Sequence, residues 1–159
     1  MTKPVRVLWV DDSPALLRVY SKLVQRTPDM EMAGTLTSAD DLAAESSRLK
    51  PDVIVLDLTM PGKNPLRALA ELTALDPDAR TIVFSGYDDE ATVREAMQAG
   101  AWGLVSKMVD GSPGDVLGAI RRVSEGESCF PGWASGGGDP PVVETPRRPG
   151  GTLRPDERP

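Results

Sequence analysis

The chain has 159 residues, of which 40% are hydrophobic, carries a formal net charge of −6 and contains no histidine. This size and composition suit one soluble domain with a sizeable core, while the negative charge argues against nucleic acid as a direct partner of that domain. The absence of histidine excludes His-ligated metal sites and Ser-His or Cys-His catalysis, and a single cysteine, Cys129, fits a reducing compartment because no internal disulfide can form.

Alternating strand and helix patterns begin at the N-terminus. The apolar, β-branched run at 5–10 predicts a strand that is covered on both faces. Ser13 and Pro14 follow it and predict the start of a helix, with serine as the N-cap and proline in the first turn. The side chains expected on the buried face of that helix recur at helical spacing and are Leu16, Val19, Tyr20, Leu23 and Val24.

The same alternation continues to residue 123. The expected elements, in chain order, are a strand at 30–36, a helix at 39–49, a strand at 52–57, a helix from Asn64-Pro65 to about Leu75, a strand at 81–85, a helix at 89–98, a strand at 102–106 and a helix from Ser112-Pro113 to Val123. Ser38 with Asp41 three residues later resembles a capping box for the helix at 39–49, and Gly100 is a stop signal for the helix at 89–98. Five strand–helix pairs predict an α/β domain, a parallel sheet with helices on both faces.

Composition changes near residue 130. Residues 131–159 are dense in proline and glycine, and such a segment cannot bury enough apolar area to offset its ordering entropy. We therefore expect a folded domain over 1–130 and a disordered tail over 131–159. No segment approaches the roughly 20 consecutive apolar residues of a membrane span, and the N-terminal apolar run is too short for a signal peptide, so we expect a cytoplasmic protein with no membrane partner.

Polar side chains stand at the carboxyl ends of four predicted strands. These side chains are Asp11 and Asp12, Asp57, Ser85, and Lys107. In a parallel sheet such ends meet at one edge, where ligands bind. Three carboxylates in one small site repel each other, and Mg²⁺, which prefers oxygen ligands, relieves that repulsion. The carboxylate that remains can act as a nucleophile toward a phosphoryl group, with the cation, the ammonium and the hydroxyl neutralising charge.

The segments WVDD, VLDLTMPG, FSG and GAWGLVSK resemble the motifs of the bacterial response-regulator receiver domain, in the same order and at the same spacing over roughly residues 5–126. The resemblance implies a (βα)5 doubly wound, flavodoxin-like fold with strand order 2-1-3-4-5. It makes Asp57 the phospho-acceptor. It places Mg²⁺ on Asp12, Asp57 and the Thr59 backbone carbonyl, with Asp11 assisting through water, and it puts Ser85 and Lys107 on the phosphoryl group.

The resemblance also implies partners. The phosphoryl donor would be a sensor histidine kinase or a phosphotransfer protein, and phosphorylation would present a surface to a downstream protein, with a phosphorylation-dependent homodimer as one form of output. The chain would carry out its own phosphorylation and dephosphorylation without being an enzyme for a separate substrate. Because the Pro/Gly-rich tail cannot hold a helix-turn-helix, we expect no direct DNA binding by this chain.

Two positions depart from the family pattern. Many members carry a proline with a cis bond after the lysine, where this chain has Met108, for which we expect a trans bond. An aromatic residue usually lies three positions before the lysine and moves inward on phosphorylation, and here Leu104 occupies it, so the expected switch pair is Ser85 and Leu104. Leu104 and Met108 favour an alternative interpretation, a phosphorylation-independent scaffold with the same fold, against which the intact five-residue site argues. A second alternative is a phosphatase of the haloacid-dehalogenase type, but that class needs an aspartate two residues after the nucleophile, where this chain has Thr59.

Overall fold

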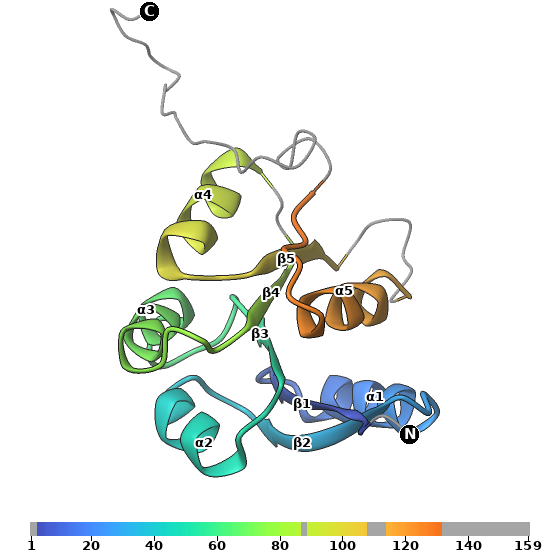
Figure 1. Ribbon diagram of the computed structural model, residues 1–159. Helices are drawn as coiled ribbons and strands as arrows, with labels where there is room; N and C mark the ends of the chain where they lie inside the picture. Colours follow the sequence, from blue (N-terminus) through green and yellow to red (C-terminus); the bar gives the residue numbers. More distant parts are fainter. Residues whose placement is uncertain (1–2, 87–88, 108–113, 132–159) are drawn as a thin grey trace, which may run out of the picture.

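Five parallel strands form one sheet at the centre of the computed structural model, which describes residues 3–86, 89–107 and 114–131 (Figure 1). The strands are β1 (Val5–Val10), β2 (Met30–Leu36), β3 (Val53–Asp57), β4 (Thr81–Ser85) and β5 (Gly103–Ser106). Their order in the sheet is β2-β1-β3-β4-β5. The predicted fold class and strand order are therefore confirmed.

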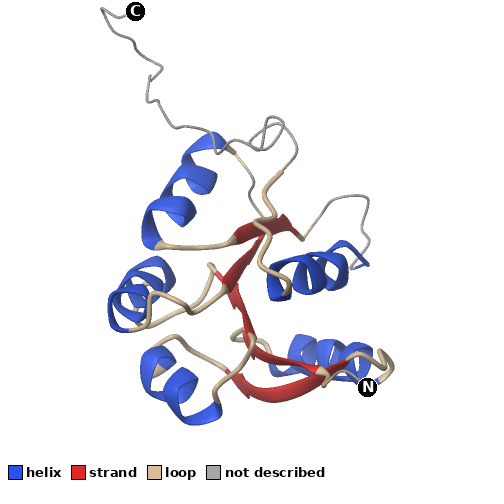
Figure 2. Cartoon of the chain, in the orientation of Figure 1, coloured by secondary structure: helices blue, strands red, loops and turns tan. Residues whose placement is uncertain are grey.

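Helices cover both faces of the sheet. They are α1 (Pro14–Gln25), α2 (Leu42–Leu49), α3 (Pro65–Leu75), α4 (Glu90–Ala99) and α5 (Gly114–Ser124). Helices α1 and α5 lie on one face, and α2, α3 and α4 lie on the other (Figures 1 and 2). Each face buries its own apolar cluster, which explains why the central strands are hydrophobic on both sides. None of the described helices is long and apolar enough to span a membrane.

Helix starts follow the capping residues in most cases. The Ser13 hydroxyl accepts a hydrogen bond from the N–H of Leu16, which confirms the predicted N-cap. The Asn64 side chain accepts from the N–H groups of Leu66 and Arg67, which confirms the predicted helix start at Asn64-Pro65. The Asp89 side chain caps α4 in the same way. Ser112-Pro113, the predicted start of the last helix, lies outside the described residues.

The capping box predicted at Ser38 is wrong. Helix α2 begins at Leu42, its N-cap is Asp41, and Asp41 makes no side-chain capping bond. The Ser38 hydroxyl instead accepts a hydrogen bond from the N–H of Asp40 at 3.3 Å. Because the Ser38 hydroxyl is engaged in this local turn, it does not cap the helix. Short polar side chains compete with helical geometry in this way.

The buried face predicted for α1 is partly wrong. Leu17, Tyr20 and Val24 are its buried residues, whereas Leu16 and Val19 are 39% and 57% exposed. Both sets satisfy helical spacing, so the period alone does not select between them. Packing against the sheet decides, because Leu17, Tyr20 and Val24 join the apolar cluster that contains Trp9 of β1, where the Tyr20 ring stacks on Trp9 with centroids 4.5 Å apart. Such an aromatic pair adds about 1 kcal/mol beyond burial of its area.

Candidate functional site: a carboxylate cluster at the strand ends

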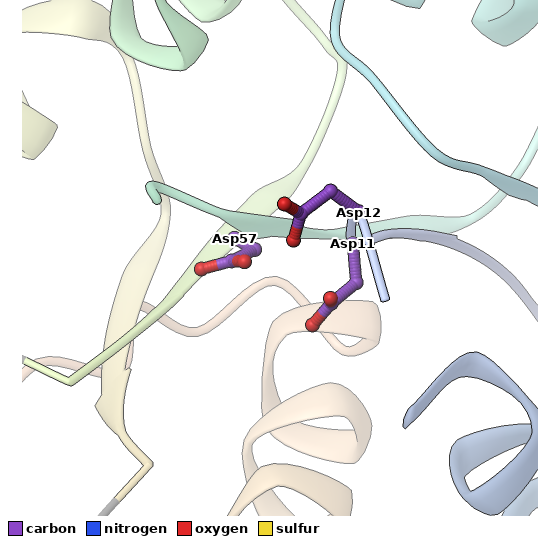
Figure 3. Close-up of side chains that lie close together, drawn as sticks. All are labelled: Asp11, Asp12 and Asp57. Carbon is purple, nitrogen blue, oxygen red and sulfur yellow. The ribbon is translucent and has the colours of Figure 1, made fainter. Parts of the chain in front are cut away.

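Three carboxylates gather at the carboxyl edge of the sheet (Figure 3). Strands β1 and β3 are neighbours, and Val10 pairs with Leu56, so the residues that follow each of them lie side by side. One carboxylate oxygen from each of Asp11, Asp12 and Asp57 lies within 4.8 Å of the others. This confirms that the topology brings together acids that are 45 residues apart in the sequence.

Asp57 is held rigidly and faces the cluster. Its side chain is almost fully buried, and its Oδ1 accepts a hydrogen bond from the Thr59 N–H at 3.1 Å. Oδ1 also lies 3.3 Å from the Lys107 ammonium. Strand β3 is buried along its whole length, so the carboxylate has little freedom to turn away.

Asp11 is equally buried and has a fixed orientation. Its Oδ1 accepts a hydrogen bond from the Ser13 N–H at 2.9 Å, and its Oδ2 lies 3.4 Å from the Lys107 ammonium. Asp12 differs, because it is exposed to solvent. The cluster therefore combines two buried, oriented carboxylates with one that water can reach, which suits a cation that keeps part of its hydration shell.

Lys107 links two of the three acids. It follows β5, and its side chain is 21% exposed. Burial alone lowers the pKa of Lys107, but attraction to Asp57 and Asp11 outweighs burial and raises that pKa. The ammonium also lies 5.5 Å from the centre of the Phe84 ring, within the range of a cation–π contact. Lys107 is therefore a bridge, charged at neutral pH, between β5 and the ends of β1 and β3.

The balance of charge in the cluster calls for a further cation. Burial raises the pKa of Asp57, and the hydrogen bond from Thr59 and the Lys107 charge lower it only in part. Three carboxylates face one ammonium among the described residues at this edge. An oxygen-only donor set with a surplus of negative charge fits Mg²⁺. Asp11, Asp12 and Asp57 are the side chains that would hold it.

The remaining predicted site residues lie close by in the fold. Ser85 ends β4, is fully buried, and its carbonyl accepts a hydrogen bond from the Lys107 N–H at 2.8 Å. Thr59 is exposed and follows Asp57 in the loop after β3. Leu104 is 2% exposed and belongs to the apolar cluster on the face covered by α2, α3 and α4. Its side chain is thus part of the core, and Met108, the other position that departs from the family pattern, lies outside the described residues.

Two contributors to the site escaped sequence reasoning. The Ser13 N–H orients Asp11, and the pattern of aspartate followed two residues later by a serine before a helix is a signal for such a turn. The Phe84 ring lies under the Lys107 ammonium, but strand alternation gives no sign of that contact. Both residues support charged groups without reacting themselves.

A hollow at the opposite end of the strands is a weaker candidate for a functional site. It has a volume of about 1170 Å³, and Arg6 and Arg80 are among its lining residues. Both arginines already have partners in the protein, because Arg6 donates to the carbonyls of Leu49 and Lys50 and Arg80 donates to those of Val123 and Ser124. These cations cap helix ends, so the carboxylate cluster is the better candidate site.

Comparisons with known proteins agree with this site. Residues 7–120 match the response regulator receiver domain family. The chain is 36% identical to the chemotaxis protein CheY of Thermotoga maritima over 120 residues, which are 76% of this chain and 98% of that protein. It is 34% identical to the nitrate/nitrite response regulator protein NarL of Escherichia coli, over 79% of this chain but only 57% of that regulator. The match therefore spans little more than half of NarL.

Solved structures give the same result. A LuxR-family two-component response regulator from Aurantimonas aligns with a TM-score of 0.75 at 28% identity, over 80% of this chain and 89% of that one. The response regulator domain of Thermotoga maritima CheB aligns with a TM-score of 0.70 at 29% identity, over 77% and 98%. The acidic cluster lies at the strand ends where the sequence resemblance placed a phosphorylation site. The chain belongs to the response regulator receiver domain family of two-component systems.

Proposed function

We propose that Asp57 accepts a phosphoryl group from the phosphohistidine of a sensor histidine kinase or phosphotransfer protein. The observation that carries this proposal is the buried Asp57 carboxylate, fixed at the end of β3 beside Asp11 and within 3.3 Å of the Lys107 ammonium. A nucleophile, an acidic cation site and a fixed positive charge are the parts that phosphoryl transfer needs. The family match supports the same role for the chain.

The transfer is a substitution at phosphorus. An oxygen of Asp57 forms the new O–P bond while the N–P bond of the donor histidine breaks, and the electron pair of that bond stays on the histidine nitrogen. Because the Thr59 N–H and Lys107 already contact Oδ1, the second oxygen, Oδ2, is the one we assign as nucleophile. Lys107 and the Ser85 hydroxyl then stabilise charge on the phosphoryl oxygens.

Mg²⁺ enters this proposal as a resident cofactor. Asp11, Asp12 and Asp57, with the Thr59 carbonyl, would hold it, and when bound it neutralises the carboxylates and the incoming phosphoryl group. The chain itself supplies the geometry. Asp11 is oriented by Ser13, and Asp57 by Thr59, before any ligand arrives. This pre-organisation lowers the reorganisation needed at the moment of transfer.

The output we propose is a change of protein-interaction surface rather than turnover of a separate substrate, so the chain is not an enzyme in the usual sense. Phosphorylation shifts a pre-existing equilibrium and exposes a surface to a downstream protein or to a second copy of the chain. That this chain does not itself bind DNA stays a prediction from its charge and sequence.

The test is intact mass after incubation of the full chain with acetyl phosphate and Mg²⁺. We expect one phosphoryl group on the wild type and none on Asp57→Asn, which keeps the shape of the side chain but removes the nucleophile. Asp41→Asn is the matched control, because Asp41 is an exposed acid without a capping bond, and it should be labelled like the wild type.

Two outcomes would contradict the proposal. Labelling of Asp57→Asn would move the acceptor to another residue. Absence of any adduct on the wild type, together with no binding of beryllofluoride in the presence of Mg²⁺, would favour the phosphorylation-independent scaffold.

A further inference from the structure

The chain turns back toward the sheet directly after α5. The Gly126 N–H bonds the Val123 carbonyl and the Glu127 N–H bonds the Arg122 carbonyl, at 3.0 Å each, and Gly126 has a φ of +97°. This is a Schellman ending, which a glycine in left-handed conformation makes favourable. The turn sends residues 127–131, which we call the strap, along the outer edge of β5 (Figure 1).

The strap pairs with β5 as a very short parallel strand. The Leu104 N–H donates to the Cys129 carbonyl and the Cys129 N–H donates to the Trp102 carbonyl, each at 2.9 Å. These two bonds make one bridge, between Gly103 and Cys129. In the same register, the next bond would need an N–H from Pro131, which proline lacks. The pairing is therefore limited to one bridge by the sequence itself.

Side chains of the strap pack on opposite faces of the sheet. Cys129 contacts the apolar cluster under α1 and α5, whereas Phe130 contacts the cluster under α2, α3 and α4. Both residues are only partly buried. This alternation is that of an edge strand, and its ladder consists of one bridge, which is short for a strand.

The strap and β5 are in very close backbone contact at Gly103. A Cβ added to Gly103 would lie 2.5 Å from the Cys129 carbonyl oxygen, so only glycine permits this approach. A shift of β5 relative to the strap therefore breaks the contact instead of being absorbed by it. The strap is sensitive to the position of one strand of four residues.

That same strand leads directly to the carboxylate cluster. Lys107 follows β5 and bridges Asp11 and Asp57, while Gly103 at the start of the strand bears the strap. Leu104 also belongs to this connection, because its backbone N–H bonds Cys129 although its side chain is fixed in the core. One short strand thus joins the candidate phosphorylation site to the segment that ends the described chain.

We propose that the strap is a latch that phosphorylation of Asp57 releases, an inference that rests on the proposed function. Phosphorylation replaces the single negative charge of the carboxylate with a phosphoryl group that carries close to two, and Lys107 moves from the two acids to the phosphoryl oxygens. The end of β5 at Ser106 follows Lys107, and the strand loses its close fit to the strap. Release exposes the N–H of Leu104 and the carbonyl of Trp102 to an extended segment of a partner protein, which can add to the sheet edge.

Cys129 reports this release because it is the single cysteine of the chain and lies at the bridge. The experiment measures the rate at which iodoacetamide modifies the full chain, by intact mass, with Mg²⁺ alone and with Mg²⁺ plus beryllofluoride. We expect on the order of tenfold faster modification with beryllofluoride, since local opening controls access to a partly buried thiol. Asp57→Asn should show the slow rate in both conditions.

Three variants separate the strap from a general change in stability. Gly103→Ala should be modified rapidly without beryllofluoride, because the added Cβ displaces Cys129. Gly118→Ala is the matched control in α5, where an added Cβ meets nothing within 4 Å, and should behave like the wild type. Pro131→Ala restores the N–H for a second bridge and should slow modification in both conditions, which keeps the test decisive if Gly103→Ala does not fold.

The possible failures are distinguishable. If acetyl phosphate labels Asp57 and beryllofluoride binds, but the rate at Cys129 is unchanged, the strap is a static edge cover and the latch is refuted while the proposed function stands. If neither reagent acts on the wild type, the proposed function fails and the latch with it. A fast rate in the unliganded wild type, equal to that of Gly103→Ala, would also overturn the latch.

Discussion

The ionised form of Asp57 costs the folded protein free energy when no metal is bound. Burial raises its pKa above the ordinary value of 3.8, and the contacts from Thr59 and Lys107 offset this only partly. Because the folded pKa lies above the unfolded one, the stability associated with the protonated form is fully present below 3.8. It is lost as the pH rises through the folded pKa.

This sign leads to a measurable pH dependence. Without Mg²⁺, Asp57→Asn should have a larger free energy of unfolding than the wild type at neutral pH, and the difference should shrink as the pH falls toward 3.8. Urea unfolding at both ends of that range measures it. A difference that stays constant over the range would show that burial of the Asp57 charge is not its cause, and Asp41→Asn controls for the change in net charge.

Much of the site could be predicted at the scale of single residues. Asp11, Asp57 and Lys107 each stand directly at or after the end of an apolar run, and parallel strands place such ends together. The bridge that Lys107 makes to both acids could not be predicted, because it depends on the register between neighbouring strands and on side-chain rotamers. No periodicity in the sequence carries that information.

At the scale of elements, the strands were predicted within one residue and the helices less well. Buried parallel strands have one strong signal, a continuous apolar run, so β3 and β4 could be predicted from the sequence. Helix α2 began three residues later than predicted because Ser38 makes a local turn instead of a cap. The strap was missed altogether, since a single bridge has no pattern of its own and depends on the Gly103 backbone being open to contact.

Capping gives a prediction for one element. Asn64→Ala should lower the free energy of unfolding by about 1 kcal/mol, because the Leu66 and Arg67 N–H groups lose their side-chain acceptor. Asp41→Ala is the matched control at the start of α2, where no capping bond exists, and should cost only a few tenths of a kcal/mol. Chemical denaturation of the two variants measures both values, and equal losses would refute the capping account.

At the scale of the whole molecule, the question is where the folded domain ends. The boundary predicted at residue 130 falls inside the strap, and residues 132–159 lie outside the described part of the chain. The strap contributes packing through Cys129 and Phe130. Half-burial of two such side chains is worth roughly 1–2 kcal/mol.

Two truncations test this boundary. Removal of residues 132–159 should leave Tm unchanged, because that Pro/Gly-rich composition offers little area to bury. Removal of residues 127–159 should lower Tm by about 5 °C, since the strap goes with it. Thermal unfolding followed by circular dichroism gives both values. A large drop in the first truncation would show that the tail itself packs on the domain.

The strap also bears on the tendency of this protein to associate through its sheet edges in concentrated solution. An open sheet has two edges, here β2 and β5, and an uncovered edge is a template for aggregation. The strap blunts the β5 edge with a proline-ended segment of the same chain, so the resting molecule is protected from edge-to-edge association. Under the latch proposal, phosphorylation removes that protection, so we expect the phosphorylated form to be the less soluble one.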